Sequence, residues 1–151
     1  MQWPTAAVLS EYPSLVESKP LDKNIPISIV DDDESVREAM AGLMKSYGYI
    51  VETFDSGPSF LNSDHRGRTN CLIADVQMPG MTGFELHSEL VAAGDPIPTI
   101  LITAHPDDRA RARALKAGVL CYLAKPFSEV DLLGCIRTAI EQRGAKREES
   151  P

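Results

Sequence analysis

Residues 27–40 read ISIVDDDESVREAM. The first four residues, 27–30, hold three aliphatic side chains and one serine, a composition that fits a buried parallel strand. Three aspartates at 31–33 end this run, and a helical period follows it. Apolar side chains recur at offsets 0, 4, 7, 8 and 11, at Val36, Met40, Leu43, Met44 and Tyr47. A strand that passes through an acidic turn directly into an amphipathic helix predicts the first half of a βαβ unit.

The same alternation continues along the chain. Further strands are predicted at 50–54, 71–74, 99–102 and 120–123, and helices near 58–62, 83–91, 107–117 and from Ser128 onward. Five strands alternating with five helices predict an α/β fold, a flavodoxin-like (βα)₅ doubly wound parallel sheet. The leading strand order is 2-1-3-4-5, which places a ligand site outside the carboxyl ends of the strands.

The composition predicts one soluble domain. The chain has 151 residues, with 22 Asp+Glu against 15 Lys+Arg and a formal charge of −7. This acidity argues against direct binding of nucleic acid or of an anionic membrane, because both depend on a cationic surface. We find no apolar run long enough to span a membrane and no cationic start of a signal peptide, so we expect a cytoplasmic protein.

Three segments are expected. Residues 1–24 contain several prolines and no sustained period, and predict an irregular arm. Residues 25–143 hold all the strand and helix patterns and form the domain. The charged residues 144–151 predict a disordered tail or the start of a linker. The cysteines, Cys71, Cys121 and Cys135, are expected to be small buried hydrophobes, since they are odd in number and set among apolar neighbours.

Polar side chains follow the predicted strands at one edge of the sheet. Residues 31–33 follow the first strand, Asp75 the third, Thr103 the fourth and Lys125 the fifth. Packed carboxylates repel one another, so a cation must share the site. Two or three Asp side chains suit Mg²⁺, which keeps open positions for water and phosphate. These residues predict a metal-assisted phosphoryl site, in which Asp33 is a helix N-cap rather than a ligand.

At these motifs the sequence resembles the receiver domain of bacterial two-component response regulators. The resemblance covers residues 25–143. It depends on IVDDD at 29–33, ADVQMPGMTG at 74–83, TA at 103–104 and KPF at 125–127. In detail the sequence is most similar to receivers that precede helix-turn-helix output domains. The resemblance implies a phosphorylation-activated signalling switch, not a turnover enzyme, with slow self-dephosphorylation.

The resemblance also implies site roles. Asp75 would accept the phosphoryl group from the phosphohistidine of a partner sensor histidine kinase. Asp31 and Asp32, with Asp75 and the backbone carbonyl of Gln77, would hold Mg²⁺. Lys125 would contact the phosphoryl group, and its bond to the following proline is often cis in this family.

Two further pairs are singled out. Thr103 and Tyr122 resemble the switch pair, in which the hydroxyl moves toward the phosphoryl group and the aromatic ring turns inward. Gln77 and His105 each lie two residues beyond a site residue, so we expect them to set the phosphoryl lifetime.

The predicted helix at 107–117 carries a basic stripe. Arg109, Arg113 and Lys116 lie at offsets 0, 4 and 7 of an otherwise acidic domain. With the fifth strand and the last helix, this helix is the expected output face. The stripe would bind a second copy, giving a phosphorylation-dependent dimer, or a downstream output protein.

Two alternatives share parts of this pattern. Asp31 and Asp33 satisfy the Asp-x-Asp of a haloacid-dehalogenase-type phosphatase, although Asp75 would then have no explanation. A flavodoxin-type flavin module shares the architecture, but carboxylates occupy the loop where an FMN phosphate needs hydroxyls and amides.

Overall fold

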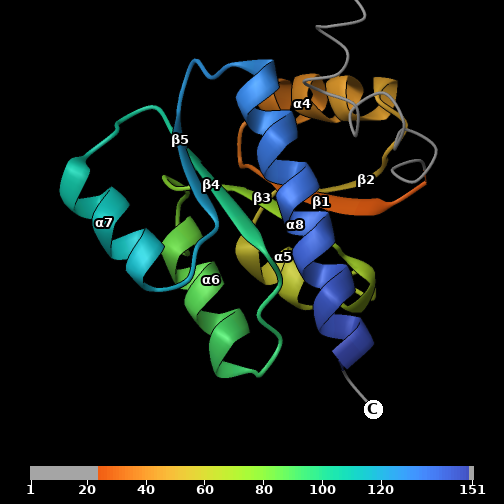
Figure 1. Ribbon diagram of the computed structural model, residues 1–151. Coiled ribbons are helices and arrows are strands. Elements are labelled where there is room, and N and C mark those ends of the chain that lie inside the picture. Colours follow the sequence, from red (N-terminus) through yellow and green to blue (C-terminus); the bar gives the residue numbers. More distant parts are fainter. Residues whose placement is uncertain (1–23, 150–151) are drawn as a thin grey trace, which may run out of the picture.

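The computed structural model describes residues 24–149 and contains one five-stranded parallel sheet (Figure 1). The strand order is β2-β1-β3-β4-β5, which confirms the predicted topology. All four neighbouring pairs run parallel. The strands are β1 Pro26–Val30, β2 Ile50–Phe54, β3 Leu72–Asp75, β4 Thr99–Thr103 and β5 Cys121–Ala124.

Helices connect the strands, and side-chain caps begin most of them. Asp33 caps the first, accepting a hydrogen bond from the backbone N–H of Val36, as predicted. Thr82 and Glu85 form a reciprocal capping box at another. The helices are α4 Glu34–Ser46, α5 Gly57–Leu61, α6 Gly83–Ala92, α7 Asp108–Lys116 and α8 Glu129–Glu149, with a 3₁₀ turn at Arg66–Arg68.

The sheet separates two apolar cores. One core joins α4 and α8 to one face of the strands through residues such as Met44, Ile136 and Ile29. The other joins α5, α6 and α7 to the opposite face, through residues such as Phe60 and Leu86. Helices therefore cover both faces, and the carboxyl ends of the strands remain open at one edge.

The last helix is longer than predicted. It runs to Glu149, so residues 144–149 of the predicted tail continue the helix instead of leaving it. The apolar period stops at Ile140, which hid this extension, but Ala, Lys, Arg and Glu all favour helix. The predicted arm, up to residue 23, lies outside the described residues. Within residues 24–149, no helix is long and apolar enough to cross a membrane.

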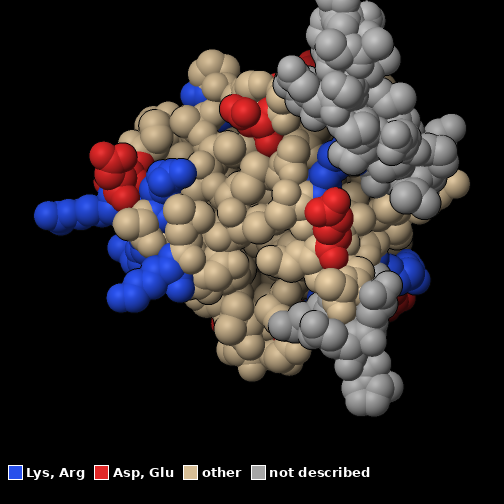
Figure 2. Space-filling view, in the orientation of Figure 1, with Lys and Arg blue, Asp and Glu red and all other residues tan. Residues whose placement is uncertain are grey.

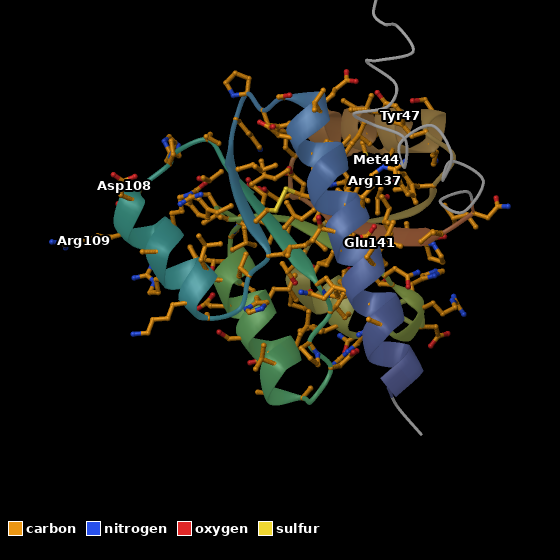
Figure 3. All side chains as sticks on the ribbon, in the orientation of Figure 1. Met44, Tyr47, Asp108, Arg109, Arg137 and Glu141 are labelled. Atoms are coloured by element: carbon orange, nitrogen blue, oxygen red, sulfur yellow. A yellow bond between two sulfur atoms is a disulfide. The ribbon has the colours of Figure 1, made fainter. Side chains whose placement is uncertain are left out.

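The cysteine prediction is wrong for two of the three residues. Cys121 on β5 and Cys135 on α8 form a disulfide, drawn as the yellow bond in Figure 3. Cys71 is the buried free thiol that was predicted, and burial raises the pKa of its thiol. Residues 14 apart in sequence met because the turn after β5 brings α8 back across that strand. Spacing alone does not reveal such a pairing.

Candidate functional site

The carboxyl ends of four strands bring the predicted side chains to one edge. Asp31 follows β1, Asp75 ends β3, Thr103 ends β4 and Lys125 follows β5. Parallel register aligns these ends: Asp75 pairs with Ile102, and Thr103 pairs with Ala124. Residues distant in the sequence thus share one small site.

Three carboxylates form the centre of this site. Asp31, Asp32 and Asp75 each offer an oxygen, and these oxygens all lie within 4.8 Å of one another. Asp31 is 3% exposed and Asp75 is 8% exposed, whereas Asp32 is open to solvent. Asp33 lies outside this group, since its carboxylate caps α4. The backbone of Asp33 instead donates to Oδ1 of Asp31 at 2.9 Å, which helps to orient that carboxylate.

Lys125 supplies the cation that the sequence required. Its Nζ lies 3.3 Å from Oδ1 of Asp75 and 3.7 Å from Oδ2 of Asp31. The Lys125–Pro126 peptide bond before the last helix is cis, as the resemblance implied. One ammonium facing three carboxylates leaves the cluster negative, so the site attracts further positive charge.

The environment of Asp75 raises the pKa of its carboxyl above the ordinary value. Burial raises the pKa of this carboxyl, and the nearby carboxylates of Asp31 and Asp32 raise it further, while Lys125 opposes both effects. Among the described residues, Oδ1 of Asp75 is buried and receives no hydrogen bond, although the Lys125 ammonium lies beside it. The ammonium of Lys125, 3.3 Å away, is the cationic neighbour of this buried oxygen.

A hard divalent cation fits these observations. The donor set consists of carboxylate oxygens, which Mg²⁺ prefers, and Asp32 leaves one side of the cluster open to water. The single ammonium of Lys125 leaves the three carboxylates with excess negative charge. The chain therefore offers a chemically suitable magnesium site.

Thr103 is fully buried, and its hydroxyl is engaged. It donates to Oε1 of Gln77 at 2.8 Å and accepts from the backbone N–H of His105 at 3.0 Å. The structure thus joins three predicted residues, Thr103, Gln77 and His105, in one hydrogen-bonded group beside Asp75. The side chains of Gln77 and His105 are exposed at the rim of the site.

Tyr122 lies on β5, the strand that Lys125 follows, and its ring is turned inward. It is 8% exposed and stacks on Phe84 of α6, with ring centroids 6.4 Å apart. The guanidinium of Arg113 on α7 lies 5.2 Å from the centre of the Phe84 ring. One residue of the predicted basic stripe is thereby connected to Tyr122 through an aromatic side chain.

The basic stripe lies on the solvent side of α7. Figure 2 shows Lys and Arg side chains gathered over this helix, and Figure 3 shows Arg109 projecting away from the molecule. Ala110 and Ala114 occupy the opposite, buried face. The stripe is therefore a surface that another molecule can reach.

Sequence reasoning missed three supporting residues. Arg37 donates to the backbone carbonyl of Asp31 at 2.6 Å and so holds the turn after β1. At Gly83 a Cβ would lie 2.6 Å from the carbonyl oxygen of Asp75, so only glycine lets α6 begin this close to the site. Phe84 is the third. Each role depends on a spatial contact that has no signature in spacing alone.

Comparisons with known proteins agree with this geometry. Residues 27–137 match the family model described as the response regulator receiver domain. The response regulator protein TmoT of Ectopseudomonas mendocina is 40% identical over 144 residues, which cover 95% of this chain and 66% of TmoT. The haloacid-dehalogenase alternative finds no support in these matches.

Solved structures give the same result. The response regulator StyR superposes with a TM-score of 0.72 and 42% identity, covering 82% of this chain and 62% of StyR. The FixJ-N crystal structure superposes with a TM-score of 0.70 and 32% identity, covering 79% of this chain and 95% of FixJ-N. This chain therefore spans about two-thirds of the length of TmoT and of StyR, but corresponds to nearly the whole of FixJ-N.

Proposed function

The chain belongs to the response regulator receiver domain family, and on that premise we propose that it is a phosphorylation-activated switch with Asp75 as its phosphoacceptor. The receiver unit in this proposal is residues 25–143, which contain the whole sheet. The phosphoryl donor is the phosphohistidine of a sensor histidine kinase.

One observation carries the choice of Asp75. Its buried Oδ1 lies 3.3 Å from the Lys125 ammonium, and its carboxylate shares the cluster with Asp31 and Asp32. Asp31 has its Oδ1 engaged by the backbone of Asp33, and Asp33 caps α4. Asp75 is therefore the carboxylate best prepared to act as nucleophile.

The proposed step is an in-line displacement. A bond forms between a carboxylate oxygen of Asp75 and phosphorus as the bond from phosphorus to the histidine nitrogen breaks, and that nitrogen leaves with its electron pair. Asp31, Asp32 and Asp75, with the backbone carbonyl of Gln77, would hold Mg²⁺. When bound, Mg²⁺ neutralises charge on the phosphoryl oxygens. Lys125, whose Nζ lies 3.3 Å from Oδ1 of Asp75, would contact the same oxygens.

Thr103 and Tyr122 would convert this charge change into a change of shape. In the structure the Thr103 hydroxyl donates to Oε1 of Gln77 at 2.8 Å. A phosphoryl oxygen on Asp75 offers a stronger, charged acceptor, so the hydroxyl would exchange Gln77 for it. The Tyr122 ring is already turned inward against Phe84 in the structure, so the expected inward turn would here be a shift of a buried ring into the space that the Thr103 hydroxyl leaves. Phe84 also contacts Arg113.

The proposed readout is the face formed by α7, β5 and α8. Arg109, Arg113 and Lys116 lie on α7, and Arg113 contacts Phe84, which stacks on Tyr122. The partner would be a second copy, in a phosphorylation-dependent dimer, or an output domain or protein. Gln77 and His105, at the rim of the site, would set the rate at which water removes the phosphoryl group.

Phosphorylation by a small donor tests the proposal. Incubation of the purified chain with acetyl phosphate should give one acid-labile phosphate per chain, and only when Mg²⁺ is present. The Asp75→Asn variant should give none. The matched Asp64→Asn variant, at an exposed carboxylate outside the cluster, should behave like the wild type. Metal-independent labelling, or full labelling of Asp75→Asn, would reject the proposal.

A further inference from the structure

An open groove lies on the surface between β5 and α8, on the face that the proposed function assigns to output. Its volume is about 420 Å³. Cys121 on β5 and Cys135 on α8 both line it, so the disulfide that joins these two elements borders the groove (Figure 3). Both cysteines are half-buried, unlike the fully buried Cys71. A small solute in the groove can therefore approach the disulfide.

The walls of the groove leave this approach open. Its apolar side chains come from Leu120, Leu123 and Val130. Gly134 is exposed beside Cys135, and no atom lies within 4 Å of the Cβ that another residue would add there. Asp131 is the one charged side chain among the described residues that line the groove, and its carboxylate disfavours anionic solutes. The groove therefore favours small, uncharged molecules.

The disulfide is not what keeps α8 on the sheet. Leu132, Ile136 and Ala139 of this helix are fully buried in the core that joins α8 to the strands. This apolar contact persists when the sulfur–sulfur bond is broken, because it depends on burial and not on the cross-link. Reduction should therefore leave the chain folded.

Strand β5 connects the disulfide to the proposed switch pair. It is an edge strand, and among the described strands β4 is its one neighbour. Successive side chains of a strand point to opposite faces, so Cys121 belongs to the core beneath α8 and Tyr122 to the core beneath α6 and α7. The disulfide holds the Cα atoms of Cys121 and Cys135 6.5 Å apart. A displacement of β5 that carries Tyr122 is therefore opposed by this cross-link.

We propose that the Cys121–Cys135 disulfide is a reversible thiol–disulfide exchange site, which small uncharged dithiols reach through the groove. A thiolate of the reductant attacks one sulfur, and a mixed disulfide forms as the other sulfur leaves as a thiolate. The second thiolate of the reductant then attacks its own sulfur in the mixed disulfide and releases the second cysteine. The reductant loses two electrons and two protons and becomes a disulfide, and the two cysteines become thiols.

Reduction also affects the switch, an inference that rests on the proposed function of Asp75. The cross-link favours the arrangement of β5 and α8 that the structure shows over any other. The shift of Tyr122 proposed on phosphorylation departs from this arrangement, so the oxidised chain resists the shift and the reduced chain permits it. Reduction should therefore raise the affinity of the chain for a phosphoryl analogue.

The rate of reduction tests access through the groove. The full chain is treated with excess dithiothreitol under native conditions, and its free thiols are counted by alkylation and mass spectrometry. Gly134→Leu places a side chain in the groove and should slow reduction at least about fivefold. Gly42→Leu is the matched control, since Gly42 is an exposed and equally unobstructed position within α4. It should be reduced at the wild-type rate.

This pair of variants separates access through the groove from access by unfolding. Both substitutions raise helix propensity, so reduction that required unfolding would slow equally in Gly134→Leu and Gly42→Leu. Equal rates in the two variants, or a wild type that dithiothreitol does not reduce without denaturant, would overturn the exchange site.

Beryllofluoride, a phosphoryl analogue, tests the coupling to the switch. Its affinity in the presence of Mg²⁺ is measured by nuclear magnetic resonance on the full chain. The reduced chain should bind it at least about fivefold more tightly than the oxidised chain. Cys135→Ala should bind like the reduced chain with or without dithiothreitol, which separates the bond from other effects of the reagent. Equal affinities of the oxidised and reduced chains would overturn the coupling. Absence of binding in all three would instead reject the proposed function of Asp75, and the reduction rates would still decide the exchange site.

Discussion

Nζ of Lys125 lies 3.3 Å from Oδ1 of Asp75, although their strands, β5 and β3, are separated in the sheet by β4. The lysine reaches across the carboxyl end of β4, above the buried Thr103. This ion pair only partly offsets the burial of Asp75 and the two nearby carboxylates, because the pKa of Asp75 remains raised. Ionising Asp75, the carboxylate that is proposed to react, is therefore less favourable in the folded protein than in the unfolded chain.

The unfavourable ionisation of Asp75 in the folded protein predicts that Asp75→Asn is more stable than the wild type, by an amount that depends on pH. Because the folded protein raises the pKa of Asp75 above its ordinary 3.8, the unfolded chain loses this proton at lower pH than the folded chain does. The free energy of unfolding therefore falls as the pH rises from 3.8 to the folded pKa, and the whole loss is present above the folded pKa. Without Mg²⁺, Asp75→Asn should melt a few degrees above the wild type at pH 7.

Asp75→Asn should not be less stable than the wild type at any pH in this range, but its advantage in stability should disappear in acid. Below pH 3.8 both the folded and the unfolded wild type hold the proton, so the two proteins should differ little. Thermal unfolding followed by circular dichroism between pH 3 and pH 8 measures this. A wild type that is more stable than Asp75→Asn at pH 7 in the absence of metal would refute the argument.

Neighbouring aspartates should have different roles toward Mg²⁺. Asp32→Ala removes one of the three clustered carboxylates, so Mg²⁺ affinity measured by calorimetry should fall at least about tenfold. Asp33→Ala is the matched control, because this side chain caps α4. It should lose about 1 kcal/mol of stability and keep its Mg²⁺ affinity within a few-fold. Equal loss of affinity in both variants would exclude the assigned ligand set.

Gln77, which accepts a hydrogen bond from Thr103, and His105 are predicted to set the lifetime of the phosphoryl group. Gln77 lies at the rim, where its side chain can orient or block an attacking water. Gln77→Ala and His105→Ala should each change the half-life of the phosphorylated chain by more than about twofold, as followed by loss of acid-labile phosphate. Half-lives within twofold of the wild type in both variants would leave the two residues without this role.

The Cys121–Cys135 disulfide should contribute measurably to stability. It closes a loop of residues 14 apart, for which chain entropy predicts about 3 kcal/mol. Urea unfolding with and without a dithiol reductant should show a loss of that order. Cys135→Ala should show the same loss without reductant and no further response to it. A wild type insensitive to reductant while Cys121 and Cys135 are shown to be reduced would contradict this prediction.

The fold and the acidic site were predictable because both depend on local patterns. Apolar runs ending in Asp31 and Asp75 specify strands whose carboxyl ends carry charge, and right-handed crossovers then bring those ends together. Asp33 was recognised as a cap from its position before a helical period. These inferences need only the period of the sequence and the rules of parallel sheets.

Other features depend on packing that no local pattern encodes. The Cys121–Cys135 bond and the Arg143–Asp95 pair join elements whose separation is known only after α8 is placed. The extension of α8 to Glu149 lacks an apolar stripe. The hydrogen bond from Thr103 to Gln77 depends on the rotamers of both side chains, which the sequence pattern does not specify.

Locating the phosphorylated residue tests the central claim most directly. The chain is phosphorylated with acetyl phosphate and Mg²⁺, the aspartyl phosphate is reduced with borohydride, and peptides are sequenced by mass spectrometry. We predict a single modified residue, Asp75, with loss of the signal in Asp75→Asn and in the absence of Mg²⁺. Modification of Asp31 or Asp32 in the wild type, with Asp75 unmodified, would contradict the account.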